Sequence, residues 1–126
     1  MDDCELIREA SEALERAYAP YSGFRVGACV LTPAGEAFGA CNVENSSLGL
    51  TICAERAAIA AAVAKGHRKI DKVVVVSEKA EKPPFPCGAC LQVMSEFGVE
   101  TVIVGTLGRS FKTYEFSQLL PKPFRL

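Results

Sequence analysis

The stretch TICAERAAIAAAVAKG, residues 51–66, is almost wholly apolar, yet Glu55 and Arg56 stand side by side near its start. The stretch is predicted to be a helix that ends at Lys65 and Gly66, because a cation followed by glycine is a typical helix end. A glutamate in the first helical turn is ordinarily a solvated residue that the helix dipole favours. The alternative is that Glu55 moves protons and Arg56 balances charge at a metal site.

The residues before this helix predict a first helix followed by a β-hairpin. Apolar side chains recur at helical spacing over residues 2–19, and Pro20 would end that helix. Residues 25–31 and 36–41 are predicted to be strands. The turn residues between them, 32–35, predict that the two strands form a hairpin.

The residues after this helix predict the middle of a sheet. Four consecutive valines, 73–76, are apolar on both faces of a strand, which is typical of a central strand. This central strand is predicted to span residues 72–77. The remaining elements are predicted as a polar loop at 42–50, a proline-rich loop at 81–86, a helix at 87–97 that closes at Gly98, strands at 101–106 and 110–114, and a short helix at 115–120.

This order of elements predicts the fold class. Helices that alternate with strands in the order α-β-β-α-β-α-β-β-α indicate an α/β fold in which a mixed sheet lies between helices. The sequence contains neither an internal repeat nor a low-complexity linker. One domain is therefore expected to span residues 1–126.

Composition narrows the classes of function. The chain has 126 residues, 49% of them hydrophobic, and a net charge of −1, which is typical of a folded domain. Its longest basic cluster, 67–69, has three residues, so a small neutral substrate is favoured over a nucleic acid. The acidic residues 1–5 do not resemble a signal peptide, and no apolar run approaches the roughly 20 residues that cross a bilayer. A cytoplasmic location without membrane contact is expected.

The cysteines suggest a metal site. In a reducing compartment, six cysteines are more plausibly thiols or metal ligands than disulfides. Cys53 and the pair Cys87 and Cys90 each lie at the start of a predicted helix. Backbone N–H groups at a helix N-terminus favour the thiolate, which is the form that binds metal. Two such N-termini that meet would bring the three sulfurs together, whereas Cys4, Cys29 and Cys41 are expected to be small buried or half-buried residues.

Three protein ligands around tetrahedral zinc leave one position for water, which distinguishes a catalytic zinc site from a structural one. Glu55 would then lie beside that water and exchange protons with it. Three thiolates make the site strongly negative, so Arg56 is expected to donate hydrogen bonds to the sulfurs and offset their charge.

Two other interpretations remain open from these residues. Cys87 and Cys90 alone are compatible with a dithiol oxidoreductase, although that leaves Cys53 and Glu55 unexplained. A non-enzymatic zinc module would need a fourth ligand, for which Cys41 is the available candidate.

Several motifs together resemble the small, homotetrameric cytidine deaminases of nucleoside salvage. They are YAPYSGFRVGA (18–28), CNVEN (41–45), CAERAAI (53–59) and PCGACLQVMSEF (86–97). A Cys-x-Glu motif followed by Pro-Cys-x-x-Cys is the arrangement of zinc-dependent deaminases. The resemblance extends over nearly the whole chain.

The resemblance implies a three-layer α/β/α sandwich around a five-stranded mixed sheet. It also implies zinc-dependent hydrolysis of cytidine and deoxycytidine to uridine and deoxyuridine plus ammonia, in pyrimidine salvage. A homotetramer with its sites near subunit interfaces is expected. A related deaminase with another amino-bearing substrate remains an alternative.

The resemblance also assigns roles to individual residues. The zinc ligands would be Cys53, Cys87 and Cys90, with Glu55 as the proton shuttle and Arg56 bonded to the ligand sulfurs. The substrate contacts would be Asn42 and Glu44 at the ribose, Phe24 and the Ala54 backbone at the base, and Phe124 in a neighbouring subunit's site. Leu48 and Leu91 stand where the family commonly has Tyr and Arg, which bears on substrate choice and assembly rather than on zinc chemistry.

Overall fold

A computed structural model describes residues 1–79, 81 and 83–126 of the chain, so residue 82 of the predicted proline-rich loop lies outside the described residues. The strands are β1 (Val26–Leu31), β2 (Ala37–Cys41), β3 (Lys72–Ser77), β4 (Thr101–Thr106) and β5 (Phe111–Glu115). The helices are α1 (Asp3–Leu14), α2 (Ala54–Ala64), α3 (Gly88–Glu96) and α4 (Phe116–Leu119), with a 3-10 turn, η1 (Leu48–Leu50).

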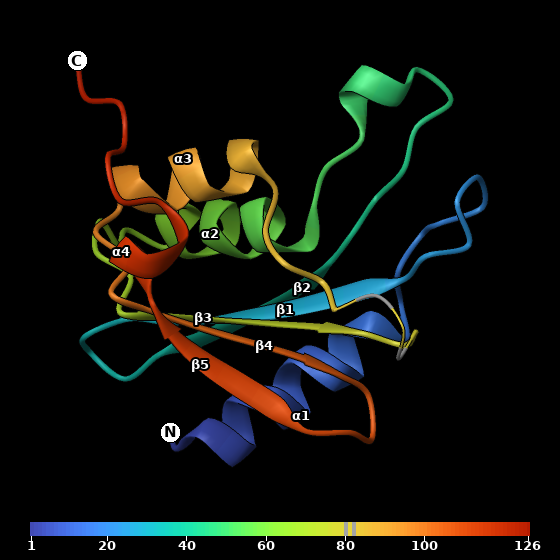
Figure 1. Ribbon diagram of the computed structural model, residues 1–126, viewed down its shortest axis with the longest axis horizontal. Helices are drawn as coiled ribbons and strands as arrows, with labels where there is room; N and C mark the ends of the chain where they lie inside the picture. Colours follow the sequence, from blue (N-terminus) through green and yellow to red (C-terminus); the bar gives the residue numbers. More distant parts are fainter. Residues whose placement is uncertain (80, 82) are drawn as a thin grey trace.

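The strands within these residues form one sheet of five strands in the order β2-β1-β3-β4-β5. β3 and β4 are parallel, and the other neighbouring strands are antiparallel. α1 covers one face of the sheet, while α2 and α3 cover the other (Figure 1). The three-layer α/β/α arrangement with a mixed sheet and a central β3 is therefore confirmed.

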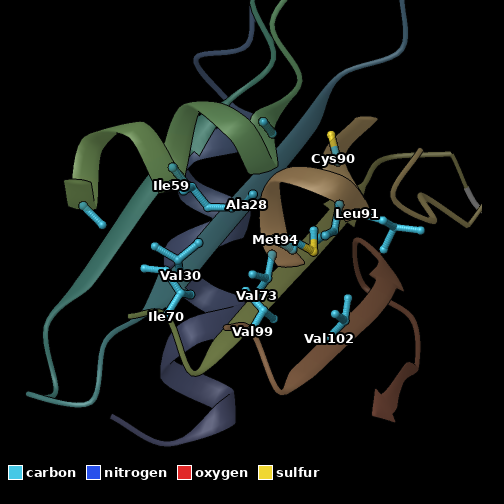
Figure 2. Packing of buried hydrophobic residues seen from close by; sticks show 14 of the residues in the cluster. Ala28, Val30, Ile59, Ile70, Val73, Cys90, Leu91, Met94, Val99 and Val102 are labelled. Carbon is cyan, nitrogen blue, oxygen red and sulfur yellow. The ribbon is translucent and has the colours of Figure 1, made fainter. Parts of the chain in front are cut away.

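The larger core lies between the sheet and the pair α2 and α3. Ile59 of α2 and Met94 of α3 pack over Ala28, Val30 and Val73 of the sheet (Figure 2). All five side chains are at most 2% exposed. This packing fixes the position of α2 and α3 on the sheet, and hence where their N-termini lie.

A second core joins α1 to the opposite face. Leu6, Ala10 and Leu14 of α1 pack against Cys29 and Val74 of the sheet. α1 begins at a capping box in which the Asp2 side chain accepts from the backbone of Glu5, 2.9 Å away.

The N-terminal helix is shorter than predicted. It ends at Leu14 rather than Ala19, although apolar spacing continues to Tyr18. The backbone N–H of Tyr18 instead donates to Asn42, and Tyr18 pairs with Val43 in an isolated bridge. Tyr18 is half exposed, and its pairing with a distant segment overrides the local helical pattern.

Cys4 is exposed on α1, so the prediction that it is buried or half-buried is also wrong. The helical face that carries Cys4 points away from the sheet.

The predicted polar loop after β2 forms an arm that carries exposed apolar side chains. Residues 43–52, including η1, extend away from the sheet in Figure 1. Leu48 and Leu50 at its tip are 75% and 66% exposed. None of the helices within the described residues combines the length and apolar character needed to span a bilayer.

Candidate metal centre and adjoining pocket

Three cysteines from two helix starts meet at one point. Cys53 is the N-cap of α2 and Cys87 is the N-cap of α3, while Cys90 lies in the first turn of α3. Their Sγ atoms all lie within 4.8 Å of one another. Among the described residues, 1–79, 81 and 83–126, these three cysteines are the one group of cysteine, histidine or acidic side chains found close enough together to hold a metal ion.

The donor set fits zinc. Thiolates are soft ligands that select zinc among the common divalent metals of proteins, and Zn–S bonds of about 2.3 Å place tetrahedral sulfurs a little under 4 Å apart. Cys90 is buried, Cys53 is half-buried and Cys87 is exposed, so one side of the cluster opens outward. Three sulfurs leave one tetrahedral position for a further ligand.

The closeness of the sulfurs shifts their acidity. The neighbouring Cys90 thiol and the Arg56 guanidinium lower the pKa of Cys53 to about 5. The neighbouring Cys53 and burial raise the pKa of Cys90. Cys53 is therefore a thiolate at neutral pH, which is the state that ligates a metal.

Arg56 contacts this cluster from the first turn of α2. Its Nη2 donates to Cys53 Sγ at 3.4 Å and to the Thr51 carbonyl oxygen at 3.5 Å. The Nε atom of Arg56 is buried and has no hydrogen-bond partner among the described residues. The guanidinium is thus held against the sulfurs, where its charge offsets theirs.

Glu55 lies beside the cluster and is almost completely excluded from solvent. It is 5% exposed, although it belongs to the first turn of a helix. Burial raises the pKa of Glu55 to about 7, and the neighbouring Cys53 thiolate adds to the shift. Because Glu55 is buried, the interpretation as a solvated helix-start residue is wrong. A carboxyl with a pKa near 7 can both accept and donate a proton near neutral pH.

A cavity of about 270 Å³ adjoins the cysteines and Glu55. Its lining includes the predicted substrate residues Phe24, Asn42, Glu44 and Ala54, together with Cys53, Glu55 and Cys87. The structure thus brings together residues from the loop before β1, the end of β2 and the starts of α2 and α3. Phe124, the remaining predicted contact, does not line this cavity and is 70% exposed near the C-terminus.

The polar wall of the cavity is tied to the scaffold. The Asn42 side chain accepts from the backbone N–H of Val26 and donates to the carbonyl of Phe24, both at 2.9 Å. Glu44 accepts from the backbone N–H groups of Tyr21 and Ser22 and from the Ser22 hydroxyl. These donors, the hydroxyl first, lower the pKa of Glu44, so it is ionised at neutral pH.

Six lining residues were missed by sequence reasoning: Ser22, Val26, Thr51, Val75, Pro84 and Phe85. Phe85 lines the cavity from the segment before α3, and its ring packs edge-to-face on Tyr114 of β5, with centroids 5.4 Å apart. Ser22 lines it from the turn before β1. Phe85 carried no periodic signal, whereas Ser22 lies within the motif 18–28 and could have been singled out there.

The geometry bears on the two other interpretations of the cysteines. Cys53 joins Cys87 and Cys90, so the group is not an isolated dithiol. Cys41, at the end of β2, does not belong to the cluster found among the described residues. The fourth protein ligand that a non-enzymatic zinc module requires is therefore not supplied by Cys41.

Comparisons with known proteins cover nearly the whole chain. The family described as "Cytidine and deoxycytidylate deaminase zinc-binding region" matches residues 1–106. A cytidine deaminase of Halalkalibacterium halodurans is 43% identical over 126 residues, covering 98% of this chain and 95% of the relative. A cytidine deaminase of Sporosarcina psychrophila is 42% identical over 126 residues, covering 98% and 92%. The crystal structure of cytidine deaminase from Burkholderia pseudomallei matches with a TM-score of 0.92 and 43% identity, covering 98% of this chain and 100% of that one.

Proposed function

The chain belongs to the cytidine and deoxycytidylate deaminase family, and we propose that it hydrolyses cytidine and deoxycytidine to uridine and deoxyuridine, with release of ammonia, in pyrimidine salvage. One observation supports this most strongly. Two members of the three-sulfur cluster, Cys53 and Cys87, line one cavity of about 270 Å³ together with a buried carboxyl and an ionised carboxylate for sugar hydroxyls.

Cys53, Cys87 and Cys90 are the zinc ligands in this proposal. When bound, zinc supplies a Lewis acid that activates a water molecule near neutral pH. Arg56 donates to Cys53 Sγ and keeps the sulfur cluster from accumulating uncompensated charge. The lowered pKa of Cys53 favours the thiolate form, which is the form that binds zinc.

Glu55 is the proton carrier. It takes a proton from the attacking water and delivers it to N3 of the cytosine, which makes C4 more electrophilic. It then takes the proton of the hydroxyl now bonded to C4 and delivers it to the amino group, so the C4 carbonyl forms as the C4–N bond breaks and ammonia leaves. Its burial and its pKa of about 7 suit a group that must both accept and donate within one cycle.

The remaining lining residues hold the nucleoside. Phe24 packs on the pyrimidine, and the Ala54 backbone contacts the base. Glu44 and Asn42 face the ribose. Both side chains are hydrogen-bonded to the backbone in the absence of a ligand. They therefore lose little conformational entropy when the sugar binds.

The active unit is a homotetramer built from single domains of residues 1–126. Leu48 and Leu50 on the arm and Phe124 near the C-terminus are 66–75% exposed, which is unfavourable for a monomer in water. Phe124 is the side chain that enters a neighbouring subunit's site. Light scattering of wild type and Phe124→Ala, with KM measured for each, tests this assembly.

The enzyme works in the cytoplasm on free nucleosides rather than on nucleic acid or at a membrane. A net charge of −1 gives no electrostatic attraction to a polyanion.

The decisive experiment is uridine formation from free cytidine by the zinc-loaded protein, with Glu55→Ala as the control. We expect turnover in the wild type and a loss of at least ~10²-fold in the variant, with zinc content unchanged. Wild-type protein that holds zinc but leaves cytidine intact would refute the proposed substrate. Full activity in Glu55→Ala would refute the role of the carboxyl.

A further inference from the structure

The turn before β1 wraps one carboxylate of the cavity with three donors. Glu44 Oε1 accepts from the backbone N–H of Tyr21 at 2.9 Å and of Ser22 at 3.1 Å. Glu44 Oε2 accepts from the Ser22 hydroxyl. The Ser22 oxygen in turn accepts from the backbone N–H of Phe24 at 3.0 Å. Ser22 therefore bonds at once to the carboxylate and to the backbone of Phe24, whose ring is the proposed base platform.

The two segments are also joined through their backbones. The N–H of Glu44 donates to the carbonyl of Tyr18 at 2.8 Å, and the N–H of Tyr18 donates to Asn42 at 3.0 Å. These bonds position the main chain on either side of the carboxylate. They leave the Glu44 side chain itself to be oriented by the donors of residues 21 and 22.

Charge does not orient Glu44. Among the described residues it has no ion-pair partner, and the groups that lower its pKa are the Ser22 hydroxyl and the two backbone N–H groups. An exposed carboxylate without these bonds samples several rotamers and loses side-chain entropy on binding a ligand. The Ser22 hydroxyl is the one donor of the three that mutation can remove.

The bonding also defines what the carboxylate can recognise. An ionised carboxylate has roughly four acceptor sites and no donor. Three are used by the turn, so a site remains for one hydroxyl donor of a ligand. A sugar position that lacks an O–H cannot use this site.

We propose that Ser22 is a positioning residue that holds Glu44 in place to accept one sugar hydroxyl of the nucleoside. Ser22 itself need not touch the substrate. This inference rests on the proposed function, because it assumes that a nucleoside occupies the cavity.

The test compares Ser22→Ala with wild type on three substrates: cytidine, 2′-deoxycytidine and 3′-deoxycytidine. Removal of the hydroxyl is expected to raise KM for cytidine about tenfold and to change kcat less than about twofold, since the lost contact is uniform binding. Ser22→Thr keeps a hydroxyl and is expected to restore most of the affinity. Ser110→Ala, at an exposed serine outside the cavity, is the matched control.

The deoxy substrates separate positioning from a general structural effect. On the analogue that lacks the hydroxyl bound by Glu44, wild type and Ser22→Ala are expected to have equal KM. A penalty that persists on both deoxy substrates would overturn the proposal, as would the absence of any penalty on cytidine.

A second measurement does not depend on turnover. The ¹³C resonance of the Glu44 carboxyl, followed by NMR against pH, is expected to titrate at higher pH in Ser22→Ala than in wild type. An unchanged titration would refute the positioning role even if cytidine is the substrate. Conversely, a shifted titration in a protein that does not turn over cytidine would retain the positioning of Glu44 and reject the proposed substrate.

Discussion

Replacing Asn42 by alanine should destabilise the fold as well as weaken substrate binding. The Asn42 side chain is 8% exposed and bonds two backbone groups of the segment that leads into β1. It accepts from the N–H of Val26 and donates to the carbonyl of Phe24, both at 2.9 Å. Asn42→Ala removes both bonds and leaves those two groups without their partners.

The magnitude follows from these two bonds. A buried backbone group that loses its partner costs about 1–3 kcal/mol, and these two bonds are part-buried, so water entering the cavity offsets some of that cost. We expect Asn42→Ala to lower the free energy of unfolding by about 2–4 kcal/mol, because two groups are affected. Asn42→Asp keeps the acceptor for Val26 but places a carboxylate oxygen against the Phe24 carbonyl, so more than half of that loss is expected.

The assay is urea unfolding of both variants beside wild type, at one protein concentration and with no nucleoside present. With a slope of about 2 kcal/mol per molar urea, the midpoint should fall by roughly 1–2 M in Asn42→Ala. An unchanged urea midpoint accompanied by a raised KM would contradict this prediction. In that case Asn42 would act on the substrate alone and the two backbone bonds would carry no stability.

Three further predictions test the charge balance, the packing and the buried thiol. Arg56→Ala should lower turnover by about 10–100-fold while zinc stays bound, and Arg56→Lys should recover only part of the lost turnover. Unchanged turnover in Arg56→Ala with zinc retained would contradict the charge-balancing role. Gly27→Ala should lower the free energy of unfolding in urea by about 3 kcal/mol or more, because its Cβ would lie 2.0 Å from the Ala10 carbonyl oxygen of α1. Gly39→Ala, whose added Cβ would have its nearest contact at 3.5 Å, should change that free energy by under about 1 kcal/mol. Similar losses in the two variants would contradict the close packing of α1 on β1. Burial raises the pKa of Cys29 from 9.0 to about 12, so the neutral thiol favours the folded state and this stability is lost as pH rises from about 9 through about 12. Between pH 8 and pH 10.5, wild type should therefore lose about 2 kcal/mol more stability than Cys29→Ala, and equal losses would show that this thiol does not titrate on unfolding.

The elements that sequence predicted well are those whose signals are local. Four successive valines placed β3 at Lys72–Ser77 with both bounds correct. The cysteines at 53, 87 and 90 converge because each helix start is a local feature and the apolar faces of α2 and α3 direct both starts to one end of the sheet. The layer order followed from the alternation of helices and strands.

The features that sequence missed depend on contacts between distant segments. α1 ends early because Tyr18 pairs with Val43, a contact that no helical pattern reveals. Phe85 reaches the cavity wall because Tyr114 of β5 supports its ring. The role of Phe124 in a neighbouring subunit stays a prediction, because it depends on a second copy of the chain.

The most direct test of the proposed mechanism is a zinc titration of metal-free protein, followed by the rates of uridine and ammonia formation from cytidine. Both rates are expected to rise in proportion to added zinc and to level off at one ion per chain, and Cys53→Ser is expected neither to retain zinc nor to gain activity. Activity that is already complete in the metal-free protein, or zinc that binds at these cysteines without producing turnover, would contradict this mechanism.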